Sequence, residues 1–176
     1  LGTVTGPGVG SDTLVGIESI QGSNFADDYK AFDAPTNPNF AGTSNVPGVP
    51  TGFNSFEGMA GDDVITGNVN IQGQILTRIS YLSATAGVNV NLATGVASGN
   101  ASVGTDHFTN VNAIIGSNSA DTLSGSNNPN GTYEQFEGRG GDDVIDGRGG
   151  YDFATYNNDP ATTSGISVDL AGGKVY

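Results

Sequence analysis

Cysteine is absent from this 176-residue chain, which excludes disulfide bonds and thiolate metal sites such as structural zinc. Basic side chains are scarce, because 5 Lys and Arg stand against 18 Asp and Glu, for a formal net charge of −13. So acidic a chain repels nucleic acid, and we predict no nucleic-acid partner. No apolar run approaches the roughly 18 residues of a membrane-spanning helix, so we predict no transmembrane segment.

Helix signals are also nearly absent, since no window combines a 3.6-residue apolar spacing with freedom from Gly, Asn and β-branched residues. Alternation of apolar and polar residues at 75–81, 87–92 and 165–170 predicts short, half-buried strands. The chain has 29 Gly and is only 35% hydrophobic, so its core is thin and its acidic surface requires neutralising cations. These features predict an all-β fold.

Two segments of the chain recur. Gly-Ser-Asn-x-Ala-Asp stands at 22–27 and at 116–121, and Phe-Glu-Gly-x-x-Gly-Asp-Asp-Val-Ile stands at 56–65 and at 136–145. We therefore predict a first repeat unit over 1–104 and a second over 105–176.

The first unit contains extra residues at 30–52, a stretch with four prolines that cannot form a central strand or a helix. This stretch predicts a projecting loop. Two interpretations of it remain open, a tolerated insertion and a contact for a partner or a second subunit.

Two nonapeptides stand in tandem at 138–146 and 147–155. Each has Gly at its first, third and fourth positions, Asp at the sixth and an apolar residue at the eighth. Glycine can adopt φ > 0 and turn its carbonyl inward, and the sixth-position Asp adds a carboxylate, so the turn can offer oxygen ligands to a hard cation. The apolar eighth residue is predicted to point into the core.

This tandem resembles the calcium-binding nonapeptide repeat of the RTX (hemolysin-type) family. The resemblance implies that successive nonapeptides form a right-handed parallel β-roll or β-helix, so that both repeat units make one continuous solenoid. It also implies calcium ions held between stacked turns by sixth-position carboxylates and turn carbonyls. The frame extends to degenerate copies with other sixth positions, namely Glu18, Asn54, Asn112 and Glu134.

The candidate calcium ligands follow from this frame. Those in the tandem are Gly138, Gly140, Asp142, Asp143, Gly147, Gly149 and Asp152. Those in the first unit are Gly58, Ala60, Asp62 and Asp63, and two further candidates by register are Asp27 and Asp121. The alternative for each carboxylate is a solvated turn or a turn cap.

No catalytic constellation is evident, so we predict that the chain is not an enzyme. His107 is the only histidine and has no accompanying nucleophile pattern. Carboxylates flanked by glycine lack the apolar pocket that raises the pKa of a catalytic acid.

The predicted function is that of a calcium-binding structural repeat that folds when calcium binds. Its expected context is a surface layer, sheath, filament or adhesin array that self-associates or contacts neighbouring repeats of the same chain. The alternative is a calcium-dependent folding or secretion module of a secreted enzyme or toxin. In both cases we expect a location outside the bacterial cell or on its surface, reached by type I secretion, with any export signal outside this stretch of chain.

Overall fold

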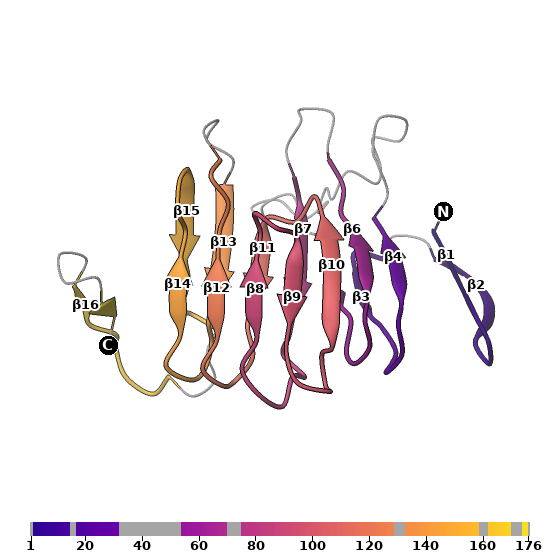
Figure 1. Ribbon diagram of the computed structural model, residues 1–176, viewed down its shortest axis with the longest axis horizontal. Helices are drawn as coiled ribbons and strands as arrows, with labels where there is room; N and C mark the ends of the chain where they lie inside the picture. The colour runs from indigo at the N-terminus through magenta and orange to yellow at the C-terminus, as the bar shows by residue number, and fades with distance from the viewer. Residues whose placement is uncertain are drawn as a thin grey trace.

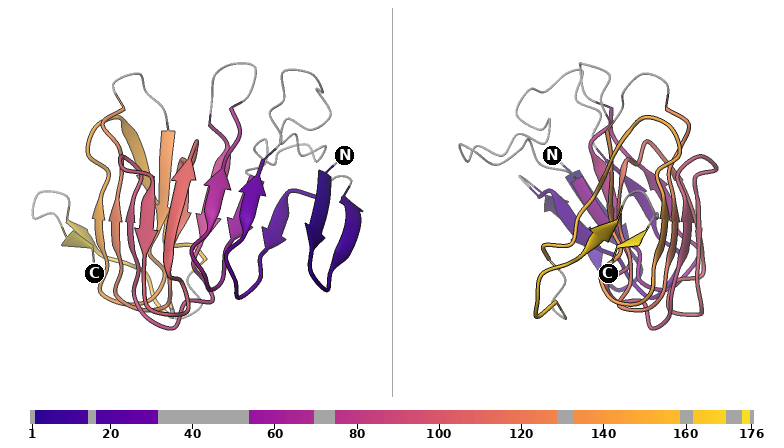
Figure 2. Two further views of the ribbon diagram at one scale, coloured as in Figure 1. Left: turned by 45° about the vertical axis from the view of Figure 1, so that its right-hand side comes forward. Right: turned by 90° about the vertical axis from the view of Figure 1, so that its left-hand side faces the viewer.

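The computed structural model describes residues 2–14, 17–31, 54–69, 75–128, 133–158, 162–169 and 174–175. Within these ranges every regular element is a β-strand, and most strands belong to two sheets that face each other (Figures 1 and 2).

The smaller of the two sheets has six strands, all paired in parallel. In chain order they are β3 (Ser19–Gln21), β5 (Asn54–Glu57), β7 (Thr77–Ser80), β11 (Ala113–Ile115), β13 (Tyr133–Glu137) and β15 (Tyr151–Ala154). Neighbours in the sheet follow this same order.

The larger sheet has seven strands in the order β14-β12-β8-β9-β10-β6-β4. Their bounds are β4 (Asp28–Lys30), β6 (Val64–Thr66), β8 (Asn89–Asn91), β9 (Val96–Ser98), β10 (Thr105–Thr109), β12 (Thr122–Ser124) and β14 (Val144–Asp146). Two antiparallel hairpins lie at opposite ends of the molecule (Figure 1), formed by β1 (Gly2–Gly6) with β2 (Gly10–Leu14) and by β16 (Val168–Asp169) with β17 (Lys174–Val175).

The hydrophobic core lies between the two sheets, because most of their short strands point an apolar side chain inward. The six-stranded sheet contributes Phe56, Ile79, Ile114 and Phe136, and the seven-stranded sheet contributes Ile65, Val90, Ala97, Phe108 and Leu123. Five of these are eighth-position residues of the nonapeptide frame, and the eighth-position residues Ile20, Tyr29 and Ile145 pack against the same core. Ala154, the last eighth-position residue, is exposed.

The predicted fold class is wrong for this chain. A parallel β-roll or β-helix, and hence one continuous solenoid, requires uninterrupted parallel pairing along each sheet. In the seven-stranded sheet β9 instead runs antiparallel to both β8 and β10, so the sheet is mixed (Figure 1). Both terminal hairpins are antiparallel as well.

The reversal at β9 follows from two tight turns. Gly95, at φ 66°, ends the turn after β8, and the Asn91 side chain accepts hydrogen bonds from two backbone N–H groups within that turn. Gly104, at φ 81°, ends the turn before β10. Such left-handed positions favour glycine because it has no Cβ. The chain therefore places three successive strands in one sheet rather than crossing to the other.

Two further expectations concern the chain around these sheets. Almost all of the proline-rich stretch predicted as a loop at 30–52 lies outside the described residues. No helix long and apolar enough to cross a membrane occurs within the described ranges.

Candidate metal-binding turns

Four of the five sixth-position aspartates lie at the beginnings of strands of the seven-stranded sheet, and the fifth, Asp152, lies in β15 of the six-stranded sheet. Asp27, Asp63, Asp121 and Asp143 directly precede β4, β6, β12 and β14. These strands pair in parallel with their first residues in register. The structure therefore brings four predicted ligands together as two pairs, which β8, β9 and β10 separate.

Backbone N–H groups connect the carboxylates of neighbouring strands. The Asp27 N–H donates to Asp63 Oδ1 at 2.8 Å, and the Asp63 N–H donates to Asp106 Oδ1 at 3.1 Å. In the other pair the Asp121 N–H donates to Asp143 Oδ1 at 2.9 Å. One oxygen of Asp63, Asp106 and Asp143 is therefore held in place by the neighbouring strand.

In three turns the second residue has a backbone conformation in the left-handed region. We call these the left-handed turns, and they are 58–63, 138–143 and 147–152. Their second residues are Met59 at φ 72°, Arg139 at φ 71° and Arg148 at φ 61°. The fourth-position glycines, Gly61, Gly141 and Gly150, also have positive φ. Non-glycine residues rarely adopt this conformation, so its recurrence at one position sets these turns apart.

In each left-handed turn the sixth-position carboxylate lies against the first-position glycine. A Cβ on Gly58 would overlap Asp63 Oδ2, and one on Gly138 would overlap Asp143 Oδ2. A Cβ on Gly147 would lie 2.6 Å from Asp152 Oδ2. Glycine is therefore required at these positions to make room for the carboxylate.

Two of these carboxylates have a buried oxygen without a hydrogen-bond partner. They are Asp63, through Oδ2, and Asp152, through Oδ1, and the Asp63 residue is 0% exposed. A buried acceptor that makes no hydrogen bond carries its full desolvation penalty. Burial raises the pKa of both carboxyls; the neighbouring charges of Asp27 and Asp62 add to the effect at Asp63, and that of Asp146 adds to it at Asp152.

The remaining predicted ligands of these turns join adjacent turns or face solvent. Asp62 and Asp142 are exposed, and Asp62 Oδ1 accepts the Thr105 N–H at 2.8 Å. Gly140 lies beside Asn118, Gly149 forms an isolated bridge with Asn127, and Ala60 is half-buried.

In other turns a serine at the second position donates hydrogen bonds to the carboxylate and so closes it to other ligands. We call these the serine turns, and they are 22–27, 116–121 and 125–126 together with Glu134. The Ser23 N–H lies 2.6 Å from Asp27 Oδ2, and its hydroxyl lies 3.1 Å from Oδ1. Ser117 donates to Asp121 in the same way, at 2.7 and 2.8 Å. The N–H and hydroxyl of Ser126 both donate to Glu134. The sequence predicted Asp27 and Asp121 as further ligand candidates by register, with a turn cap as the alternative, and in the structure a serine four residues earlier donates to each carboxylate.

In the six-stranded sheet, uncharged polar side chains lie at the beginnings of the two middle strands, β7 and β11. The Thr77 N–H donates to Asn112 Oδ1 at 3.2 Å. The Thr77 hydroxyl accepts the Asn68 N–H at 3.0 Å and donates to Asn68 Oδ1 at 2.8 Å. All three side chains are buried and uncharged, and Asn68 Nδ2 is the one buried side-chain nitrogen of this network that makes no hydrogen bond. Glu18, by contrast, is exposed.

Asp106 is a buried carboxylate that sequence reasoning did not select as a ligand. It is 1% exposed and accepts the Tyr81 hydroxyl on Oδ2 at 3.0 Å. Burial and the neighbouring Asp63 charge raise the pKa of Asp106 to about 6. The signal that could have found it is Gly104, which stands two residues earlier, as the fourth-position glycine does before the sixth-position Asp.

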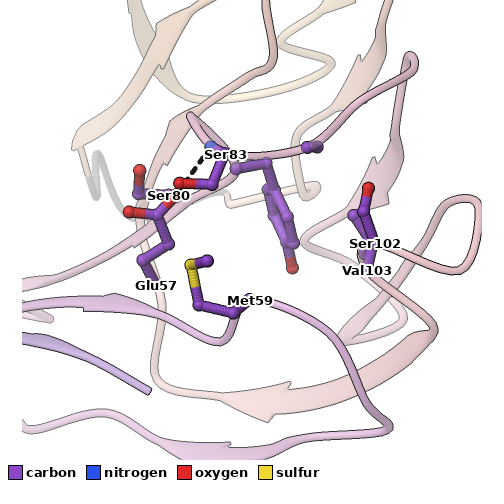
Figure 3. A pocket seen from close by; sticks show the side chains of 8 residues that line it. Glu57, Met59, Ser80, Ser83, Ser102 and Val103 are labelled. Atoms are coloured by element: carbon purple, nitrogen blue, oxygen red, sulfur yellow. Dashed lines mark hydrogen bonds between the residues drawn. The ribbon is translucent and has the colours of Figure 1, made fainter. Parts of the chain in front are cut away.

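Tyr81 also lines a shallow pocket behind the turn at 58–63. Figure 3 shows Glu57, Met59 and Ser83 on one side of this pocket and Val103 on the other. The Ser83 N–H donates to Glu57 Oε1 at 2.7 Å.

No group of three or more Asp, Glu, His or Cys side chains that could hold a metal ion occurs among the described residues. Each turn supplies one sixth-position carboxylate, so a cation there would need backbone carbonyl oxygens as further ligands, a donor set that suits calcium. No family model, curated protein or solved structure matches the chain.

Proposed function

We propose that the chain is a calcium-stabilised structural module of an extracellular or cell-surface bacterial protein, with calcium bound at the left-handed turns. The observation that carries the proposal is the buried, unpartnered Asp63 Oδ2, which lies against Gly58. A bound cation would compensate an oxygen that otherwise makes no hydrogen bond. Asp152 offers a second such oxygen.

The chemistry of the donors favours calcium over a softer metal. The turns offer carboxylate and carbonyl oxygen, and the chain has no thiol ligand. The net charge of −13 also favours cation binding, since bound calcium reduces the repulsion within the folded molecule. By analogy with other extracellular calcium modules, we expect a dissociation constant of roughly 10⁻⁴ to 10⁻³ M.

The test is calorimetric titration of the whole chain and of Asp63→Asn with calcium. We expect Asp63→Asn to bind one ion fewer. In chelator the same variant should be at least as stable as the parent, because it removes a buried charge next to Asp27 and Asp106. The matched control is Asp28→Asn, which removes a carboxylate that is 59% exposed. Equal effects of the two substitutions on calcium binding would contradict the assignment.

For the biological setting we favour an array of repeated modules. Among the described residues β14 and β15 are the outermost strands at one end of the two sheets, and they expose apolar side chains, including Val144 at 61% and Tyr151 at 65%. Exposed edges of this kind can pair with a second chain. The alternative, a folding module of a secreted enzyme or toxin, predicts a monomer.

Sedimentation velocity in calcium distinguishes the two settings. An array module should associate as its concentration rises, and Val144→Lys with Tyr151→Lys should abolish the association. A parent chain that remains monomeric would favour the secreted-enzyme setting without affecting calcium binding.

A further inference from the structure

We propose that the second residue of each turn decides whether that turn takes a cation. A serine there closes the carboxylate with protein donors, whereas the left-handed residues Met59 and Arg148 leave one carboxylate oxygen of their turns open to an ion. This inference rests on the proposed calcium binding and deepens it, because it specifies which carboxylates bind and which do not.

In the serine turns the protein itself supplies what a cation would supply. Asp121 accepts the Ser117 N–H on Oδ2, and it accepts the Ser117 hydroxyl and the Val88 N–H on Oδ1. Both oxygens are therefore engaged by three donors, and the residue is 2% exposed. A cation would have to displace hydrogen bonds that are already well formed.

Glu134 is closed by its serine in the same way and is 2% exposed. Asp27 shows the pattern at the other end of the sheet, through Ser23. Serine thus acts as a neutral substitute for an ion in three separate turns.

In the left-handed turn at 147–152 the second residue directs its N–H elsewhere. The Arg148 N–H donates to Asp146 Oδ1 at 3.0 Å rather than to Asp152. Asp152 Oδ1 is then buried without a partner, and so is Asp63 Oδ2 in the turn that contains Met59. In the turns 58–63 and 147–152 a positive φ at the second position thus accompanies a carboxylate oxygen without a partner, because it reorients the peptide whose N–H would otherwise close the carboxylate.

The consequence is a division of labour between the turns. The serine turns brace the sheets in the absence of calcium, since their hydrogen bonds require no ion. The left-handed turns add stability only when calcium is present. Asp27 and Asp121 are therefore carboxylates of calcium-independent turns, and Asp63 and Asp152 are calcium ligands.

A change of turn type that leaves every carboxylate in place tests this division. Met59→Ser with Ala60→Asn gives residues 58–60 the Gly-Ser-Asn sequence of the serine turns at 22–24 and 116–118. Calorimetric titration with calcium should then show one bound ion fewer than the parent. The control is Met59→Gly, which keeps the left-handed conformation accessible and should leave the number of ions unchanged.

A second pair of variants keeps the test decisive if the double substitution fails to fold. Asp152→Asn should lose one ion, whereas Asp121→Asn should keep all ions and lower the thermal midpoint equally in calcium and in chelator. A parent that binds no calcium would overturn the proposed function. A parent that binds calcium, but loses an ion in Asp121→Asn or keeps every ion in the folded double variant, would overturn this inference alone.

Discussion

At the scale of single residues, the contact between a first-position glycine and a sixth-position carboxylate sets the geometry of the turns. Gly58 is buried, and the space beside it is filled by Asp63 Oδ2. We predict that Gly58→Ala destabilises the protein by about 1–3 kcal/mol, the usual cost of overpacking. Urea unfolding in calcium measures it.

The control for this prediction is Gly165→Ala. A Cβ at Gly165 would have nothing within 4 Å, and its φ is not in the left-handed region. The two substitutions are chemically identical, so equal effects on the free energy of unfolding would show that the contact with Asp63 is unimportant.

Asp106 predicts a pH dependence of the metal-free protein. Its folded-state pKa is raised to about 6 from an ordinary value of 3.8 by burial and by Asp63. The folded state therefore binds more protons than the unfolded state, so stability is fully present below the ordinary value and is lost as pH rises through about 6. In chelator, the free energy of unfolding should fall by on the order of 1 kcal/mol between about pH 5 and about pH 7.

The measurement is chemical unfolding at several pH values in chelator, with Asp106→Asn as the comparison. Asn keeps an acceptor for the Asp63 N–H but does not titrate. A parent and a variant with the same pH dependence would show that Asp106 does not carry the effect.

At the scale of elements, the two sheets differ in which groups form the hydrogen bonds at the ends of their strands. The start of β7 is held by a neutral network in which the Thr77 hydroxyl bonds twice with Asn68. We predict that Thr77→Val costs about 1–3 kcal/mol, because it leaves buried Asn68 groups unpaired. Because the network contains no carboxylate, the loss should be the same in calcium and in chelator.

Thermal unfolding under both conditions measures this effect, and Thr122→Val is the control because Thr122 is exposed on β12. A loss at Thr77 that appeared only in calcium would mean that this turn also binds a cation.

The nonapeptide frame predicts the inward-facing residues well but not the strand directions. Apolar eighth-position residues such as Phe56 and Leu123 lie in the core. The sequence predicts them because the regular spacing of apolar residues directly indicates which positions are buried. The direction of β9 is not encoded in the alternation of residues 96–98, since a strand has the same period in either direction. Its reversal depends on the turns at Gly95 and Gly104, whose left-handed conformations become apparent only in three dimensions.

The sequence predicts which residues are candidate ligands, but it does not predict which of their carboxylate oxygens lack a hydrogen-bond partner. The sequence places Asp63 and Asp121 in the same frame, and both precede strands of one sheet. Whether an oxygen is free depends on a donor four residues away, as Ser117 is from Asp121, and on the backbone angle at residues such as Met59. These are properties of the folded turn, which the frame alone does not determine.

At the scale of the whole molecule, the balance between charge and core governs stability. The chain bears a net charge of −13, and its core is a single layer of side chains between two sheets. Each proposed calcium site, at a calcium concentration of about 100 times its dissociation constant, would contribute about 2.7 kcal/mol. The proposed binding at the left-handed turns would thus be comparable with the total stability of a small domain.

The measurement that tests this account most directly is chemical unfolding of the parent chain in about 10 mM calcium and in chelator, with sodium chloride added to equalise the ionic strength. Calcium should raise the free energy of unfolding by at least about 3 kcal/mol, and magnesium should have a smaller effect because it demands a stricter geometry. Identical unfolding curves in calcium and in chelator would contradict the account.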